Sequence, residues 1–318
     1  MYSLSNIRGS HGPIAAVRHN DSFYPLRALV PELELLPKHG LLDLFENWDT
    51  AHRSIINSLA DVRRIAPLPL PQAGDFLPPV LHPTHIICTG TNYYDHLVKD
   101  FNIRGFDKSA NDIIFFAKQA GSLVGSGGSV RYPTQSREFD WELELVAVIA
   151  KRGRRIPVEA ALSFVGGYTI GLDLTARDLQ FNKRQRRQFD LFGGKAFDDS
   201  APTGPEIVPA EYIDPTNLSL RLWVNGELKQ NSHTREMIWS IAEQIAELSQ
   251  HLTLEPGDLL FTGSPAGIGY PSRTFLHPGD RIDAQITGLG RLTVQIVEDP
   301  DALRVWSRPA DRVPDTHR

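Results

Sequence analysis

Residues 139–150 have the sequence FDWELELVAVIA, and this run decides how the chain folds. Successive side chains of a β-strand point to opposite faces. Leu143 and Leu145 therefore face the core, whereas Glu142 and Glu144 project together from the other face. The end of the run is apolar on both faces, which is typical of a strand buried on both sides. The acidic pair thus lies at the start of a buried strand.

Two carboxylates on one strand face repel each other unless a cation or solvent lies between them. A solvated strand face would explain Glu142 and Glu144 without any ligand. Because the same strand continues into a buried run, we favour a hard cation bound by oxygen ligands.

A third acid, Asp173, follows the next predicted strand. Thr175 and Asp178 have the spacing of a capping box and predict a helix start after it. Arg177 and Gln180 lie three residues apart and share a face of that helix. An acid beside a guanidinium and an amide indicates a binding site for a substrate that carries a carboxylate. Asp173 could equally cap the turn.

The rest of the chain is dominated by strands. Runs typical of strands and one helical repeat surround the central run: strands at 84–90, 165–172, 218–224, 258–262, 281–286 and 291–297, and a helix at 237–252. Because the strands are not regularly interleaved with helices, the fold class predicted is α+β and β-dominated. We expect the chain to have three parts. Residues 1–80 form a small N-terminal α/β module, with a strand at 13–17, a helix at 41–64 and a proline-rich linker. Residues 81–300 form the catalytic domain, and residues 301–318 form a polar C-terminal tail.

Composition excludes several classes of protein. The 318 residues are 41% hydrophobic and 22% charged with a net charge of -5, which argues against wholesale disorder and against coating nucleic acid or an anionic membrane. No run of apolar residues is long enough to span a membrane. Cys88 is the only cysteine and lies in an apolar run, so we expect a buried structural thiol, no disulfide and no cysteine-ligated metal. A soluble, cytoplasmic enzyme is the expectation.

Five motifs in collinear order resemble the fumarylacetoacetate hydrolase family, in its branch of acylpyruvases and 2-oxo-diene-dioate isomerases and hydratases. They lie between His85 and Val297: the ELE strand at 142–144, GGYT with DLTARDLQ at 166–180, GKAFD at 194–198, LWVNG at 222–226 and LEPGDLLFTGSPAG at 254–267. The resemblance implies a mixed β-roll catalytic domain, a homodimer, and a bound Mg²⁺ or Mn²⁺, with Ca²⁺ as a further option.

The resemblance also assigns roles to individual residues. It implies that Glu142, Glu144 and Asp173 are the metal ligands and that Lys195, Arg177 and Gln180 contact the substrate. Lys195 is also expected to be catalytic, because its charge would stabilise the enolate left by bond cleavage. The hydroxyl of Thr262 would help to hold a substrate carboxylate, although the turn that follows it could be merely tight.

The segment NYYDH at 92–96 is similar to the family's Asn-Tyr-x-x-His helix start. Many hydrolytic members place a glutamate three residues after this histidine, whereas this chain has Lys99 there and Asp100 next. In a helix, His96 and Asp100 would face the same way, four residues apart. We therefore expect His96 to act as the base and Asp100 to orient it.

Together these features predict a metal-dependent hydrolase that cleaves a carbon–carbon bond in a 2,4-dioxo acid and releases pyruvate. The alternatives are decarboxylation, isomerisation or hydration of an oxaloacetate-like or 2-oxo-dienoate acid, and a non-catalytic, metal-dependent oxo-acid binder. Selectivity for the acyl group is expected from the loops at 101–111 and 183–187.

Overall fold

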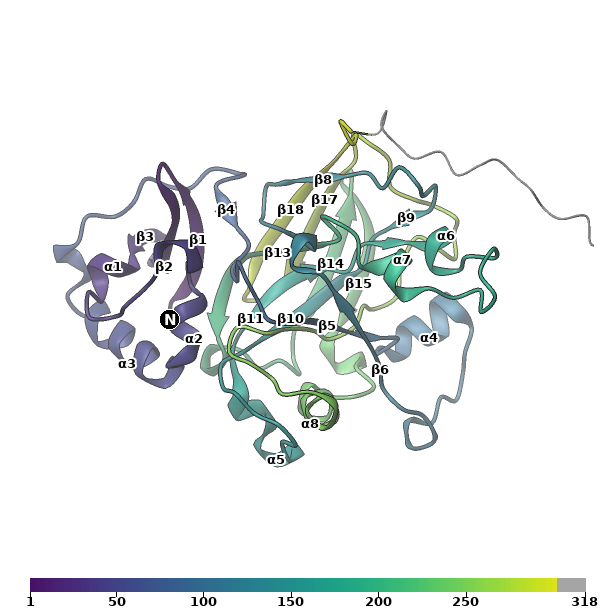
Figure 1. The fold of residues 1–318 in the computed structure, drawn as a ribbon, viewed down its shortest axis with the longest axis horizontal. Helices are drawn as coiled ribbons and strands as arrows, with labels where there is room; N and C mark the ends of the chain where they lie inside the picture. The colour runs from purple at the N-terminus through teal and green to yellow at the C-terminus, as the bar shows by residue number, and fades with distance from the viewer. Residues whose placement is uncertain (302–318) are drawn as a thin grey trace, which may run out of the picture.

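The structure is a computed structural model that describes residues 1–301, so all but the first residue of the predicted 301–318 tail lies outside the described residues. One sheet of 11 strands runs through the molecule in the order β3-β2-β1-β13-β11-β10-β16-β5-β6, with β4 paired to β1 and β7 paired to β13 (Figure 1). Its strands are β1 (Ser3–Gly9), β2 (Gly12–His19), β3 (Ser22–Pro25), β4 (Phe76–Leu77), β5 (Ile86–Gly90), β6 (Ile114–Lys118), β7 (Leu123–Val124), β10 (Leu143–Ile149), β11 (Val165–Leu172), β13 (Ala201–Pro209) and β16 (Leu259–Phe261).

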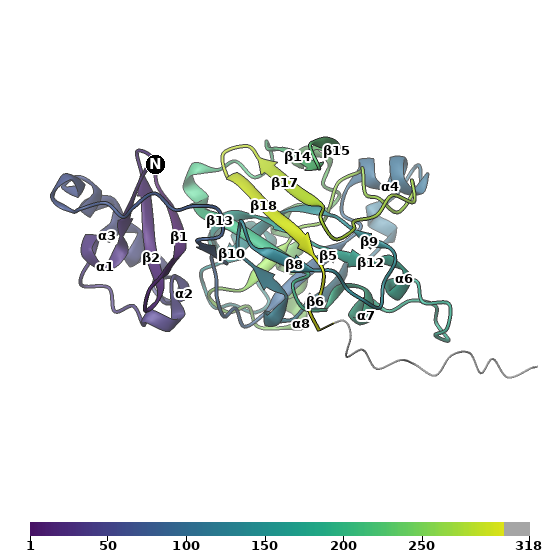
Figure 2. The same ribbon diagram turned by 90° about the horizontal axis from the view of Figure 1, so that it is seen from above.

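A second sheet of five strands has the order β15-β14-β17-β18-β8, and a two-stranded sheet pairs β12 with β9. These strands are β8 (Ser129–Arg131), β9 (Phe139–Asp140), β12 (Thr175–Ala176), β14 (Ser219–Val224), β15 (Glu227–His233), β17 (Arg281–Ile286) and β18 (Gly290–Val297). The main apolar core joins the two larger sheets, because Leu143 and Leu145 of β10 belong to the same buried cluster as Leu222 of β14 and Val294 of β18. Figure 2 shows β17 and β18 crossing over the larger sheet.

Helices cover the sheets without alternating with the strands. They are α1 (Leu26–Leu29), α2 (Leu42–Glu46), α3 (Trp48–Leu59), α4 (Tyr94–Phe101), α5 (Val158–Ala161), α6 (Arg177–Gln180), α7 (Leu191–Lys195) and α8 (Ile241–His251). A capping box formed by Ser240 and Glu243 begins α8. None of the helices within residues 1–301 is both long and apolar enough to cross a membrane. The fold is therefore α+β and strand-dominated, as predicted.

The capping box predicted at Thr175 and Asp178 is wrong. Thr175 lies in β12 and its hydroxyl donates to the carbonyl of Asp173 (2.9 Å), so it does not cap a helix. α6 is a single turn without a side-chain cap. Asp178 instead accepts hydrogen bonds from the hydroxyl of Ser136 (2.5 Å) and the backbone N–H of Arg137 (2.9 Å). Contacts distant in sequence thus replace the local cap that the spacing suggested.

The N-terminal segment contributes strands β1–β3 and helices α1–α3 at one end of the molecule, and both views show it far from α4, α6 and α7 (Figures 1 and 2). It is not separated from the rest by a gap in the sheet, because β1 pairs with β13 at Leu4 and Ile207. An apolar cluster shared by both sides contains Leu4, Phe45, Val146, Ile207 and Phe261. The division at residue 80 stays a prediction. The site lies beyond β13, at strands β11 and β10 in the middle of the strand order.

Candidate active site

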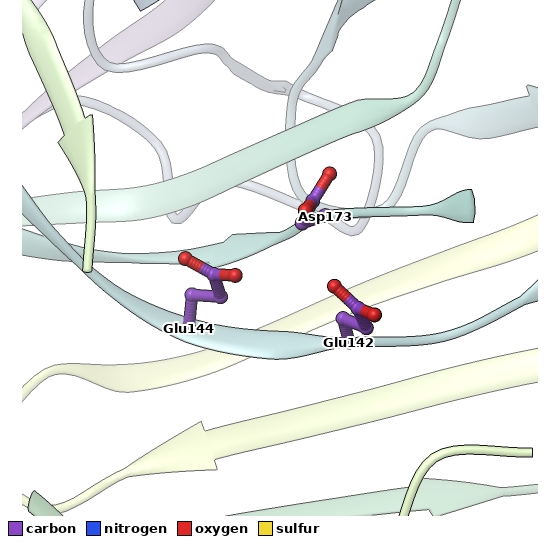
Figure 3. A group of neighbouring side chains, drawn as sticks. All are labelled: Glu142, Glu144 and Asp173. Carbon is purple, nitrogen blue, oxygen red and sulfur yellow. The ribbon is translucent and has the colours of Figure 1, made fainter. Parts of the chain in front are cut away.

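Three carboxylates meet where β10 begins and β11 ends. Glu142, Glu144 and Asp173 each offer an oxygen, and these oxygens all lie within 4.8 Å of one another (Figure 3). The antiparallel register pairs Leu143 with Leu172, and the backbone N–H of Asp173 donates to the carbonyl of Glu142 (2.8 Å). The alternation predicted from the sequence thus places Glu142 and Glu144 side by side, and the strand pairing adds Asp173.

Two buried lysines neutralise part of this acidic cluster. The Nζ of Lys195 lies 2.6 Å from an oxygen of Glu142 and 2.5 Å from an oxygen of Asp173. The Nζ of Lys118 lies 2.7 Å from the other oxygen of Asp173. Burial lowers the pKa of Lys195, but Asp173 and Glu142 outweigh it, so the pKa is raised. Burial likewise opposes ionisation of Glu142, yet Lys195 and Arg177 hold its pKa below the ordinary value.

Glu144 has no cationic partner among the described residues. Its carboxylate accepts one hydrogen bond, from the backbone N–H of Gly263 (2.7 Å). Burial, together with the charges of Asp173 and Glu142, raises the pKa of Glu144 well above its ordinary value. The oxygen of Asp173 next to Lys118 receives no hydrogen bond of good geometry. Buried carboxylate oxygens that lack donors are what a divalent cation would satisfy, so the three acids fit a divalent metal site.

Arg177 and Gln180 lie beside the acidic cluster, as the helical spacing predicted. The guanidinium donates through Nε to Asp140 (2.8 Å), through Nη1 to Gln180 (3.1 Å) and through Nη2 to Glu142. Burial lowers the pKa of Arg177, but Glu142 and Asp140 outweigh that effect and raise it. The arginine is therefore a fixed positive group in the cavity wall.

Two charged residues of the site, Asp140 and Lys118, are not among those predicted from the sequence. Asp140 is fully buried and accepts hydrogen bonds from the Nε of Arg177 and from the N–H groups of Gly269 (2.7 Å) and Tyr270 (3.1 Å). Asp140 lies two residues before Glu142, so alternation places both side chains on the same face of the run 139–150. That alternation could have identified Asp140 as a site residue. Lys118 ends the apolar run of β6, and a lone charge in such a run is also a recognisable signal.

His96 and Asp100 form a buried pair on α4. Their side chains are each 7% exposed, and the Nδ1 of His96 lies 2.6 Å from a carboxylate oxygen of Asp100. The backbone N–H of Gly267 reaches both oxygens of Asp100 (3.1 and 3.2 Å) and fixes the carboxylate. Lys99 points elsewhere, since its side chain is 64% exposed with Nζ 3.6 Å from Asp95. With Nδ1 held, Nε2 is the ring nitrogen left for proton transfer.

The structure does not bring Thr262 to the cavity. Its side chain is fully buried and its hydroxyl donates to the carbonyl of Leu145 (2.8 Å). Its own carbonyl accepts from the side-chain amide of Asn92 (2.7 Å), which ties the start of α4 to the end of β16. Ser264, two residues later, lies in the cavity wall instead.

A single cavity of about 280 Å³ gathers most of the predicted site. Seven of the nine predicted residues line it: His96, Glu142, Glu144, Asp173, Arg177, Gln180 and Lys195. Cys88 lies close by but is fully buried, and burial raises the pKa of its thiol well above the ordinary value, as expected for a structural cysteine. The cavity thus joins an acidic cluster, two cations and an imidazole.

These features define a class: an enzyme whose cavity suits a divalent metal and a small anionic substrate. The chain belongs to the fumarylacetoacetate hydrolase family, since the family model described as fumarylacetoacetate (FAA) hydrolase C-terminal matches residues 85–297.

Relatives with different activities are similar to this chain. The mitochondrial oxaloacetate tautomerase Fahd2a of Rattus norvegicus is 38% identical over 267 residues, which are 82% of this chain and 80% of the relative. Fumarylpyruvate hydrolase from Pseudomonas aeruginosa, solved with Mn²⁺ and pyruvate, is 38% identical with a TM-score of 0.61. The match covers 69% of this chain and 92% of the hydrolase. Maleylpyruvate hydrolase from Sphingobium sp. SYK-6, also solved with manganese and pyruvate, is 28% identical with a TM-score of 0.73. The match covers 93% of this chain and 99% of the hydrolase. Cytoplasmic location stays a prediction.

Proposed function

We propose that the protein hydrolyses the C3–C4 bond of a 2,4-dioxo acid and releases pyruvate and a carboxylic acid, as a homodimer that uses Mg²⁺ or Mn²⁺. The observation that carries this proposal is the pair formed by His96 and Asp100. It places an oriented base in the same cavity as the acidic cluster and Lys195. A binding protein would have no need of a buried, oriented imidazole, and this argues against the non-catalytic alternative.

The acidic cluster, Arg177 and Gln180 have distinct roles in this reaction. A divalent cation held by Glu142, Glu144 and Asp173 would supply Lewis acidity toward the 2-oxo acid. Arg177 and Gln180 are hydrogen-bonded to each other beside the acidic cluster and orient the carboxylate end of the substrate.

The proton balance of the reaction runs through His96. Its Nε2 accepts a proton from water as the water oxygen bonds to C4. The C3–C4 bond then breaks, C4 leaves as the carboxylic acid, and the electron pair stays on the pyruvate enolate. Lys195 opposes the charge of that enolate. The proton on His96 finally passes to C3, which completes pyruvate and restores the base.

Oxaloacetate tautomerisation is the second candidate, because relatives named for that activity are 38% identical to this chain. That reaction moves a proton between C3 and the C2 oxygen and consumes no water. His96 could perform it with the same nitrogen, so the base alone does not separate the two candidates.

Incubation with acetylpyruvate and Mg²⁺ tests the proposal, with pyruvate measured by a coupled assay and the decay of enol-oxaloacetate measured in parallel. We expect pyruvate release that falls at least about 100-fold in His96→Asn. Absence of pyruvate from acetylpyruvate and its longer homologues, together with rapid tautomerisation of oxaloacetate, would establish the second candidate instead.

A further inference from the structure

The mouth of the cavity differs in chemistry from its charged interior. Its lining is apolar and comes from three separate segments. These are Phe101 and Ile103 at and just after the end of α4, Ile114 on β6, and Phe181, Phe189 and Leu191 from the end of α6 to the start of α7. Ile103, Ile114 and Phe189 remain 46%, 51% and 46% exposed. Three exposed apolar side chains converging on one opening indicate a surface that a ligand covers.

We infer that this apolar mouth binds the acyl end of the substrate, and that the enzyme selects monocarboxylic 2,4-dioxo acids with an apolar acyl group over dicarboxylic ones. The inference rests on the proposed function for the identity of the inner, 2-oxo acid end. It departs from the relatives, because oxaloacetate, fumarylpyruvate and maleylpyruvate each carry a second carboxylate.

The cations that line the cavity are buried at its inner end. Within residues 1–301 its lining contains one arginine and one lysine, Arg177 and Lys195, and each is 3% exposed. Arg177 is bound to Asp140 and Glu142, and Lys195 to Glu142 and Asp173. The Nδ1 of His96 is already hydrogen-bonded to Asp100. A second carboxylate at the mouth would therefore meet no free lysine or arginine among the residues that line the cavity.

The buried charges at the inner end leave no surplus of positive side chains. Four buried carboxylates (Asp140, Glu142, Glu144 and Asp173) lie with three buried cations, Lys118, Arg177 and Lys195. A divalent cation bound there would offset this excess of carboxylates. Each further carboxylate of a substrate would add negative charge in a poorly solvated cavity.

The basic run at 183–187, expected from the sequence to govern selectivity, does not line the cavity. Its lysine and arginines are exposed, and Gln185 holds the loop by donating to Asp190 (2.6 Å). The residues that line the cavity on either side of this run are Phe181 and Phe189. From this loop the cavity therefore receives aromatic surface and no charge.

A matched pair of 2-oxo acids tests the inference by binding alone. 5-Methyl-2-oxohexanoate and 2-oxoglutarate have nearly the same shape, one ending in an isopropyl group and the other in a carboxylate. Neither has a 4-oxo group, so neither can be cleaved between C3 and C4. Calorimetric titration of the full chain with Mg²⁺ should show about tenfold tighter binding of the apolar acid.

Variants at the mouth sharpen the test. Ile103→Arg and Ile114→Arg each place a cation at an exposed position of the mouth, where folding tolerates it. Each should shift the preference by at least about fivefold toward 2-oxoglutarate. Leu228→Arg, at a 47% exposed position on β15 outside the cavity lining, should leave the preference unchanged.

Equal or tighter binding of 2-oxoglutarate by the unaltered protein would overturn the inference, as would an Ile103→Arg shift no larger than that of Leu228→Arg. These outcomes are independent of catalysis. A protein that prefers the apolar acid but releases no pyruvate from any acylpyruvate would refute the proposed hydrolysis and leave the selectivity standing.

Discussion

The cavity has two walls that are built in different ways. On the sheet wall, Glu142, Glu144 and Asp173 meet because β10 and β11 pair in one register. On the helix wall, His96 and Asp100 meet because one helical turn separates them, and a single backbone N–H from Gly267 completes the contact. The difference teaches that the proposed metal site rests on a rigid, long-range framework. The proposed base rests on a local contact that single substitutions can adjust.

Removing a ligand from the sheet wall should have the largest effect. Glu144→Ala should leave a folded protein that binds no metal at this site, because one of three buried ligands is lost, and hydrolysis should fall at least about 1,000-fold. Thermal melts check this: Mg²⁺ or Mn²⁺ should raise the Tm of the parent and not that of the variant. Full activity of the variant, or of the parent in excess chelator, would contradict the metal-dependent mechanism.

On the helix wall, Asp100→Asn should lower hydrolysis of acetylpyruvate by at least about tenfold, because the amide cannot stabilise the imidazolium that forms on His96. Lys99→Ala is the matched control, since Lys99 is exposed and pairs with Asp95. It should change kcat less than about twofold. Equal rates for Asp100→Asn and the parent would show that His96 needs no acidic partner.

Asp140, two residues before Glu142 of the sheet wall, accepts hydrogen bonds from Arg177 and from the N–H groups of Gly269 and Tyr270. Asp140→Asn removes the negative charge but keeps an acceptor. We expect KM for acetylpyruvate to rise about tenfold with a smaller change in kcat, because Arg177 loses its orientation. Steady-state kinetics beside a melting curve measure this. A lower Tm with unchanged KM would assign Asp140 to stability alone.

Thr262→Val should have the smallest effect on activity. The hydroxyl of Thr262 donates to the carbonyl of Leu145 outside the cavity lining, so its loss should cost about 1 kcal/mol in the free energy of unfolding. We expect kcat/KM to change less than about twofold. Urea unfolding and kinetics separate the two effects, and a tenfold loss of kcat/KM would return Thr262 to the substrate-binding residues.

The two walls also differ in how far the sequence predicts them. The contact of His96 with Asp100 follows from helical spacing, which is local and readable. Alternation predicts that Glu142 and Glu144 share a face, but the approach of Asp173 depends on a strand register that spacing alone does not determine. The family resemblance supplied that third ligand.

The roles of Asp140 and Lys118 could not be predicted, because their partners are distant in sequence. Arg177 and Gly269 lie 37 and 129 residues from Asp140. Lys118 reaches the backbone carbonyls of Lys195 and Ser200 from 77 and 82 residues away. The failed capping box has the same cause at Asp178, because its side chain bonds Ser136 and Arg137, which lie 42 and 41 residues away.

The pairing of β1 with β13 has a consequence for how the protein opens in solution. β13 also pairs with β11, so a chain of neighbouring strands connects the N-terminal segment to the strand that ends beside Asp173. The apolar cluster shared by Leu4 and Val146 spans the same connection. We expect the amide hydrogens of β1 and β11 to exchange with deuterium through one common opening, so that loosening the N-terminal strands also loosens the acidic cluster.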